Sequence, residues 1–255
     1  MTALPNLMVA PNGARLGHDD HGALPITLAE IIATATACRA AGADGLHLHL
    51  RDQNGAHILD GGFYREAVAE LERALPGFAV QATTEAVGQY SPAFQRTLAL
   101  ECGSRLVSVA MREITADGEI AACKALHDAS KERGISLQYI LYGADDLTRL
   151  AAMLGPRDML DGALQVLFVL GNHQGVAGRP EMLEPFLDGL SRLQIRPDWM
   201  VCAFGKTETT SLLAAHAKGG KLRVGFENSI WHQDGTVAVD NAARVAEIRA
   251  ELRTD

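Results

Sequence analysis

Two histidines separated by a single residue, His47 and His49, offer the clearest potential chemistry in this sequence. Alternate side chains of a β-strand share a face, so the two imidazoles would point to one side and the neighbouring leucines to the other. Two residues along a strand span roughly 6.6–6.8 Å, which lets two rings converge on one ion. Neutral imidazole is a frequent metal ligand. The spacing therefore indicates either a zinc or iron site or two histidines that hydrogen-bond inside a barrel.

The elements that must position these histidines form a regular alternation of short apolar strands and amphipathic helices. Apolar runs predict strands around His47 and His49 and at residues 7–10, 78–82, 106–109, 136–141, 164–170, 199–203 and 222–226. The predicted helices cover residues 27–41, 63–75, 91–103, 119–133, 145–155, 180 onward, 207 or 209 to 219, and 240–252. Eight strand–helix units in about 250 residues predict an α/β fold, the (β/α)8 TIM barrel, as one domain over residues 1–255. An open doubly wound sheet is the competing fold, but no Gly-x-Gly-x-x-Gly motif follows the first strand.

Helix starts are predicted from capping residues. Thr27 with Glu30 fits a capping box, and Ser91 precedes a proline at the first helical position. We also expect side-chain caps from Asp145 with Asp146 and from Thr207 or Thr209.

Composition excludes several classes of function. The chain has 255 residues with 47% hydrophobic and 21% charged residues, which is ordinary for a soluble globular protein. A net charge of −8 and the lack of a basic cluster argue against a nucleic-acid partner. The four cysteines form no Cys-x-x-Cys motif, so neither disulfides nor a cysteine zinc site is indicated. No signal-peptide pattern or membrane span is present, and we expect a cytoplasmic protein.

In a TIM barrel the chemistry lies at the C-terminal ends of the strands. Polar residues at the predicted ends are Asn12, His47, His49, Arg51, Asp52, Thr83, Thr84, Glu85, Arg112, Glu113, Tyr142, Asn172, His173, Lys206, Arg223, Glu227 and Asn228. Strands two and eight are second neighbours around a closed ring, so Glu227 could complete a ligand set of two histidines and one carboxylate. The alternative for Glu227 is a salt bridge to Arg223 or Lys206. Arg223 could form a bidentate ion pair with a substrate carboxylate, or a structural ion pair within the protein.

Several of these segments resemble the β-keto acid cleavage enzymes, a family first described through 3-keto-5-aminohexanoate cleavage. The matching segments cover residues 12–15, 24–27, 41–52, 83–84 and 219–228, together with Asp234, Gly235 and Asn241. The His-Leu-His-Leu-Arg-Asp segment and the later Gly-Gly-x-x-Arg-Val-Gly-x-Glu segment are specific in this order. The likeness spans essentially the whole chain.

The resemblance implies a zinc-dependent (β/α)8 barrel that condenses a β-keto acid with acetyl-CoA and releases acetoacetate and a new acyl-CoA. By motif, the ligands of Zn²⁺, or of another divalent metal, would be His47, His49 and Glu227. The metal would acidify the carbon between the keto and carboxylate groups and stabilise the enolate. Arg223 matches the active-site arginine of the family. The residues expected to bind substrate are Asn12, Thr83, Thr84 and Ser108. Acetyl-CoA is the expected co-substrate, and a homo-oligomer, a dimer or tetramer, is the expected assembly.

Three departures from the family pattern concern the base. Where the family has an aspartate that pairs with the arginine, this chain has Asn228, whose amide cannot accept a proton at neutral pH. Gln138 stands near the position of an acidic residue on the fifth strand, and Glu85 replaces a glycine after the threonine pair. The candidate replacement bases are Asp52, Glu85 and Glu113.

The leading hypothesis is therefore a zinc-dependent acyltransferase with an altered base or substrate. A metal-dependent hydrolase or lyase that does not use CoA is the second hypothesis. A metal-binding paralogue without turnover is the third. An amidohydrolase-type barrel fits less well, because the histidine pair lies on the second strand and the fifth strand offers no histidine.

Overall fold

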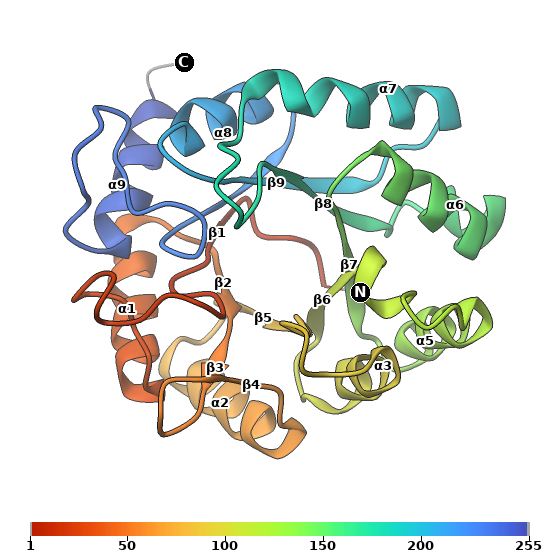
Figure 1. The fold of residues 1–255 in the computed structure, drawn as a ribbon, viewed down its shortest axis with the longest axis horizontal. Coiled ribbons are helices and arrows are strands. Elements are labelled where there is room, and N and C mark those ends of the chain that lie inside the picture. Colours follow the sequence, from red (N-terminus) through yellow and green to blue (C-terminus); the bar gives the residue numbers. More distant parts are fainter. Residues whose placement is uncertain (1, 254–255) are drawn as a thin grey trace.

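Eight short apolar strands pair side by side into a closed barrel in the computed structural model, which describes residues 2–253 (Figure 1). The barrel strands are β1 (Leu7–Val9), β2 (Gly45–Leu48), β5 (Ala79–Thr83), β6 (Leu106–Ala110), β7 (Ser136–Leu141), β8 (Gln165–Leu170), β9 (Asp198–Ala203) and β10 (Lys221–Val224). All neighbours are parallel, and the pairing of β10 with β1 closes the ring. The predicted TIM barrel is confirmed.

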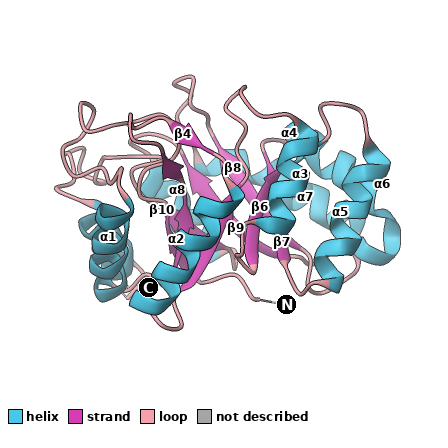
Figure 2. Ribbon diagram, turned by 90° about the horizontal axis from the view of Figure 1, so that it is seen from below, coloured by secondary structure: helices cyan, strands magenta, loops and turns pink. Residues whose placement is uncertain are grey.

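Helices surround the strands on the outside of this ring (Figure 2). They are α1 (Leu28–Ala41), α2 (Gly61–Ala74), α3 (Pro92–Glu101), α4 (Met111–Ile114), α5 (Ile120–Glu132), α6 (Ala144–Met159), α7 (Glu184–Leu193), α8 (Glu208–Ala217) and α9 (Asn241–Glu251), with a 3₁₀ helix, η1 (Pro180–Leu183), before α7. The first and last helices, α1 and α9, lie side by side, and Arg249 of α9 donates a hydrogen bond to the Gly42 carbonyl at the end of α1 (Figure 1). No helix of the described chain is long and apolar enough to cross a membrane.

The alternation of side chains along each strand divides the apolar residues into two cores. The larger core lies between strands and helices and contains Leu46, Leu48 and Leu50. A smaller core fills the barrel interior. Its members are Leu4, Met8, Leu106, Ala110, Ile140, Leu167, Val169, Met200, Cys202 and Phe204. The leucines around the histidine pair thus face the helices, as predicted, and the imidazoles face the interior.

The strand that carries the histidines is shorter than predicted. It leaves the barrel after Leu48, and the chain forms a small antiparallel hairpin from β3 (Leu50–Arg51) and β4 (His57–Ile58). Arg51 donates hydrogen bonds to backbone carbonyls of Gly13 and Leu16, so this buried arginine ties the hairpin to the loop after β1. The hairpin lies at the edge of the barrel where the longer loops gather, at the top of Figure 2.

Two predicted caps are confirmed, and two are wrong. Thr27 with Glu30 forms a complete capping box, and Ser91 caps α3. Asp240, at the predicted start of the last helix, caps α9. The N-cap of α6 is Gly143, without a side-chain cap, because Asp146 accepts instead from the Tyr142 amide. Thr207 is the N-cap of α8, but its hydroxyl donates to the Gly178 carbonyl and does not cap the helix.

Candidate functional site

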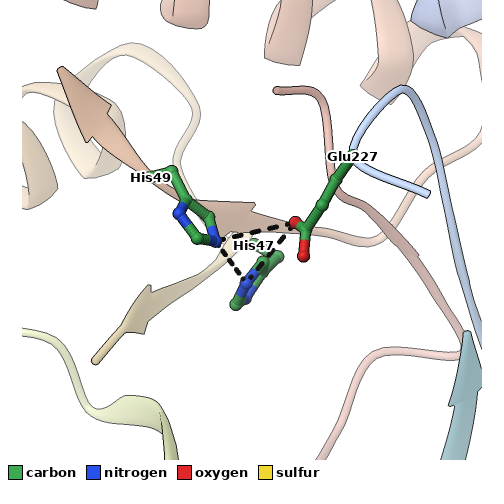
Figure 3. A group of neighbouring side chains, drawn as sticks. All are labelled: His47, His49 and Glu227. Atoms are coloured by element: carbon green, nitrogen blue, oxygen red, sulfur yellow. Dashed lines mark hydrogen bonds and ion pairs between the residues drawn. The ribbon is translucent and has the colours of Figure 1, made fainter. Parts of the chain in front are cut away.

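The side chains of His47, His49 and Glu227 converge inside the mouth of the barrel (Figure 3). The two Nε2 atoms are 3.0 Å apart, and Glu227 Oε2 lies 3.6 Å from the first and 3.7 Å from the second. All three residues are buried, and the histidines expose only 1% of their surface. The predicted association of strands two and eight is present, since Glu227 follows β10 and the histidines lie on and just after β2.

The charges of these three groups suit a cation. Burial and the nearby Arg223 lower the pKa of His47 to about 4, and burial lowers the pKa of His49 well below its usual value. Burial raises the pKa of Glu227, but the positive charge of Arg223 opposes this most strongly, and the pKa falls below the usual range. At neutral pH the site therefore presents two uncharged imidazoles and one carboxylate, which is the donor set that divalent metals bind.

The spacing of the ligand atoms also fits a metal ion. Bonds of 2.0–2.2 Å in tetrahedral geometry place ligand atoms about 3.4 Å apart, close to the three separations given above. Within residues 2–253, Glu227 Oε2 is buried and has no hydrogen-bond partner. A buried carboxylate oxygen that lacks a donor is costly unless a cation compensates it. The three residues therefore fit Zn²⁺ or a similar divalent ion.

Two glycines allow Glu227 to reach this position. Gly13 has φ of +56°, and a Cβ atom there would lie 2.6 Å from Glu227 Cγ. Gly225, the residue after β10, has φ of +140°, and a Cβ atom there would lie 2.5 Å from the Ala10 carbonyl oxygen. The Glu227 amide donates to this same carbonyl at 3.0 Å. The two glycines thus let the loops after β1 and β10 approach each other closely.

Arg223 lies beside the carboxylate, inside the barrel. Its Nη2 atom donates to Glu227 Oε1 at 3.1 Å and approaches Cys202 Sγ at 3.4 Å and Asn228 Oδ1 at 3.5 Å. Its Nε and Nη1 atoms have no hydrogen-bond partner in the described chain. The predicted ion pair to Glu227 is therefore present, and donors remain for a further anion.

An inner cavity connects the three metal-ligand candidates with most of the predicted substrate-binding residues. Its polar lining includes His47, His49, Thr83, Thr84, Glu85, Ser108, Tyr142, His173, Arg223 and Glu227. Ser108 Oγ is buried with no partner among the described residues, so it has hydrogen-bonding capacity to spare. Thr84 differs, because its hydroxyl donates to the Ser108 carbonyl.

Asn12 and Asn228 lie outside this inner cavity. Both line a larger cleft of about 410 Å³ that opens at the mouth of the barrel. Asn12 donates to the Pro25 and His49 carbonyls, which fixes the loop after β1 beside the histidines. Glu227, His173 and Phe204 line both spaces and mark where they meet. The cleft also contains Trp231, whose ring lies 4.0 Å from Lys206 Nζ.

Of the three candidate bases, only Glu85 reaches the inner cavity. Its Oε1 atom forms an ion pair of 2.6 Å with Arg15, and its Oε2 atom lies 3.9 Å from His49 Nδ1. Asp52 accepts from two backbone amides in the turn of the small hairpin. Glu113 accepts from the Ala86 amide and from Gln95, outside the cavity lining.

A second acidic group, His127 with Asp128 and Asp158, has metal-like spacing on the outside of the barrel. Lys124 forms ion pairs with both aspartates, and Lys131 pairs with Asp158. These ammonium groups already compensate the carboxylates, so the group gives no reason to infer a metal.

The sequence did not reveal Gln81 as a residue of the site, nor its contact with Gln138. Gln81 Oε1 lies 2.7 Å from His47 Nδ1, and Gln81 Nε2 donates to Gln138 Oε1 at 2.9 Å. Gln138, expected near a missing acid, lies deeper in the barrel and does not line the inner cavity. A polar residue at an inward position of an apolar strand was the available signal, since Gln81 precedes Thr83 by two residues.

Known proteins match this chain over most of its length. The model of the family described as beta-keto acid cleavage enzyme matches residues 6–254. The chain is 23% identical to a 3-oxoadipate:acetyl-CoA acetyltransferase of Cupriavidus necator, over 96% of this chain and 87% of that one. It is 24% identical to a 3-keto-5-aminohexanoate cleavage enzyme of Acetoanaerobium sticklandii, over 92% and 87% of the two chains. A solved ternary complex of ObcA with a C4-CoA adduct and oxalate shares the fold, with a TM-score of 0.67 and 15% identity. That match covers 91% of this chain and 64% of the solved one.

Proposed function

The chain belongs to the β-keto acid cleavage enzyme family, and we propose that it transfers acyl groups in a reaction that depends on zinc or another divalent metal. The proposed reaction takes a β-keto acid and acetyl-CoA to acetoacetate and a new acyl-CoA. The observation that carries the proposal is the convergence of His47, His49 and Glu227 beside Arg223 in one buried cavity. The acetyltransferase named among the relatives supports the use of acetyl-CoA.

The inner cavity has a volume of about 20 Å³, enough for the metal, and its residues would divide the work on a β-keto acid that reaches it from the larger cleft. A metal held by the three ligands would polarise the keto oxygen and stabilise the negative charge that develops as a proton leaves the adjacent carbon. The free Nε and Nη1 donors of Arg223 would bind the substrate carboxylate. The hydroxyls of Thr83 and Ser108 line the same space and would orient the substrate. We assign Glu85 as the base, because it and Glu227 are the carboxylates that line this cavity among the described residues.

The larger cleft is the proposed place of the CoA thioester. It reaches the inner cavity at Glu227 and His173, so a thioester there could meet the activated carbon of the bound acid. Arg15 lines this cleft, and Lys206 lies over the ring of Trp231, which also lines it, so these two side chains would supply cations for the phosphates of the cofactor. The cytoplasmic location and the homo-oligomer stay predictions.

A substrate panel tests this function. Purified protein loaded with zinc is supplied with β-keto acids that have neutral, anionic or cationic side chains, with and without acetyl-CoA. We expect acetoacetate and a new acyl-CoA, detected by mass spectrometry, to form only when both substrates are present. Consumption of a β-keto acid without the thioester would support the metal-dependent hydrolase or lyase instead. Zinc binding with no turnover across the panel would support the paralogue without activity.

Replacing the proposed base should slow catalysis and leave metal binding intact. We expect Glu85→Gln to lower kcat by about 10²–10⁴-fold, the range for a lost general base. The zinc content, measured by mass spectrometry of the metal, should stay at the wild-type level because the carboxylate is 3.9 Å from His49 Nδ1 and is not among the three ligands. An activity within about twofold of wild type would remove Glu85 from this role.

Asn228→Asp tests whether the family's usual arrangement can be restored. Asn228 Oδ1 already lies 3.5 Å from Arg223 Nη2, and Nδ2 has no partner in the described chain, so a carboxylate fits there. In the Glu85→Gln background we expect this second change to recover about tenfold or more of the lost kcat, since it reintroduces a proton acceptor. No recovery, with zinc still bound, would mean that the substrate carbon does not face position 228.

A further inference from the structure

Three groups inside the barrel, the Val166 carbonyl on β8 and the side chains of Gln138 and Gln81, form a hydrogen-bonded chain that ends at His47. Gln138 Nε2 donates to the Val166 carbonyl at 3.4 Å, Gln81 Nε2 donates to Gln138 Oε1 at 2.9 Å, and Gln81 Oε1 lies 2.7 Å from His47 Nδ1. Both glutamines are fully buried. They come from β5 and β7, which are separated in the barrel by β6.

The backbone carbonyl of Val166 gives this chain a direction. A carbonyl oxygen can only accept, so Gln138 must turn its NH₂ group toward Val166 and its oxygen toward Gln81. Gln81 must then turn its own NH₂ group toward Gln138 and its oxygen toward the imidazole. Since that oxygen also can only accept, His47 carries its proton on Nδ1.

We propose that Gln81 and Gln138 are positioning residues that hold His47 in the Nδ1–H tautomer, with the lone pair of Nε2 directed at the metal. The inference rests on the proposed metal site, because Nε2 faces His49 Nε2 and Glu227 Oε2. A hydrogen bond on the far nitrogen of a ligating histidine fixes the ring and strengthens its basicity. Here the hydrogen bond between Gln81 and His47 is itself oriented by Gln138, which contacts neither the ring nor the metal site.

His49 has no comparable hydrogen bond at Nδ1. Its Nδ1 atom is buried with no hydrogen-bond partner among residues 2–253, and the nearest carboxylate oxygen, of Glu85, is 3.9 Å away. The two ligands are therefore not equivalent. His47 is prepared for the metal before binding. His49 Nε2, 3.0 Å from the lone pair of His47 Nε2, donates to it in the metal-free protein, so the proton of His49 must move to Nδ1 when a metal binds.

The test compares variants at each step of the chain. Gln81→Met removes the acceptor, and we expect zinc affinity, measured by competition with a chelating dye, to fall about 10–100-fold. Gln138→Met leaves the side-chain amide of Gln81 free to rotate by about 180°. We expect zinc affinity to fall about threefold to tenfold, the size of one neutral hydrogen bond. In Gln138→Glu, a buried carboxyl group that stays protonated can donate its O–H to the Val166 carbonyl and accept from Gln81, so the affinity should stay within about twofold of wild type.

Gln165→Met is the matched control. Gln165 is a buried glutamine directly opposite Gln138 on β8, and its Nε2 atom donates to the Thr2 carbonyl, away from His47. This variant should bind zinc like the wild type. Thermal unfolding of all metal-free variants will show whether a loss of affinity reflects a loss of folding.

A second readout needs no metal. Long-range ¹H–¹⁵N spectra of metal-free protein labelled on histidine should show His47 as the Nδ1–H tautomer in wild type and a mixture of tautomers in Gln138→Met. Unchanged spectra and unchanged affinity in Gln138→Met would overturn the inference and leave the proposed function standing. Wild-type protein that binds no zinc at His47 and His49, yet shows the Nδ1–H tautomer, would overturn the metal site instead.

Discussion

A His47→Ala, His49→Ala double variant should lose its bound zinc and with it acyl transfer, by about 10³-fold or more, because several kcal/mol of charge stabilisation in the transition state would disappear. His173 and Glu85 also line the inner cavity, but neither belongs to the cluster of ligand atoms that the two histidines form with Glu227. Metal content per protein and the rate of acyl-CoA formation measure the two effects.

Two comparisons make this result interpretable. The double truncation leaves a cavity in the barrel, so His47→Gln, which keeps most of the volume and the polarity, is measured beside it. His127→Ala is the matched control, because it removes a buried histidine of the second acidic group on the outer side of the barrel. Zinc that persists in the double variant, or that falls equally in His127→Ala, would contradict the proposed ligand set.

An Arg244→Leu variant should unfold with a free energy lower by about 3–5 kcal/mol, the cost of leaving a buried charge without its partner. Arg244 and Glu208 are fully buried and pair at 2.8 Å. Arg244 also pairs with Glu247 and donates to Thr209. Glu208 in turn accepts from the amide of Gly225, at the start of the loop that carries Glu227. The variant should therefore also weaken zinc binding.

The loss of unfolding free energy in Arg244→Leu should depend on pH. Burial raises the pKa of Glu208 to about 7 although Arg244 opposes the shift. A carboxyl group whose pKa is raised on folding favours the folded state below its unfolded pKa, and this advantage is lost as the pH rises through the folded pKa. Without Arg244 the pKa of Glu208 rises further, so the deficit of the variant should be larger at pH 8 than at pH 5.5.

Urea unfolding at both pH values measures this difference. Arg249→Leu, on the same helix α9, is the matched control, because it breaks a partly exposed pair with Asp44 and should cost about 1 kcal/mol or less. Adding Glu208→Gln to Arg244→Leu removes the buried charge and should recover stability at pH 8. A deficit below about 1 kcal/mol at both pH values would show that this pair contributes little.

The sequence by itself determined the repeating architecture and the orientation of the histidines. Both depend on periodicity, which is local: apolar strands alternate with amphipathic helices, and Leu46 and Leu48 alternate with His47 and His49. The same reasoning predicted that Glu227 could meet the histidines, because ring closure makes strands two and eight second neighbours. The family resemblance through the segments around His47 and Arg223 is confirmed by the match over residues 6–254.

Only the tertiary structure decided which polar groups face one another. Arg15 and Glu85 are 70 positions apart in the chain, and Gln81 and Gln138 are 57 apart, yet each pair is in hydrogen-bond contact. Residue spacing within one strand tells which side chains point into the barrel, but it carries no information on the register between strands, on which these contacts depend. For the same reason the sequence showed only that Gln138 stands near the position of an acidic residue of the family, and the closed barrel adds that its amide oxygen accepts from Gln81, which contacts His47.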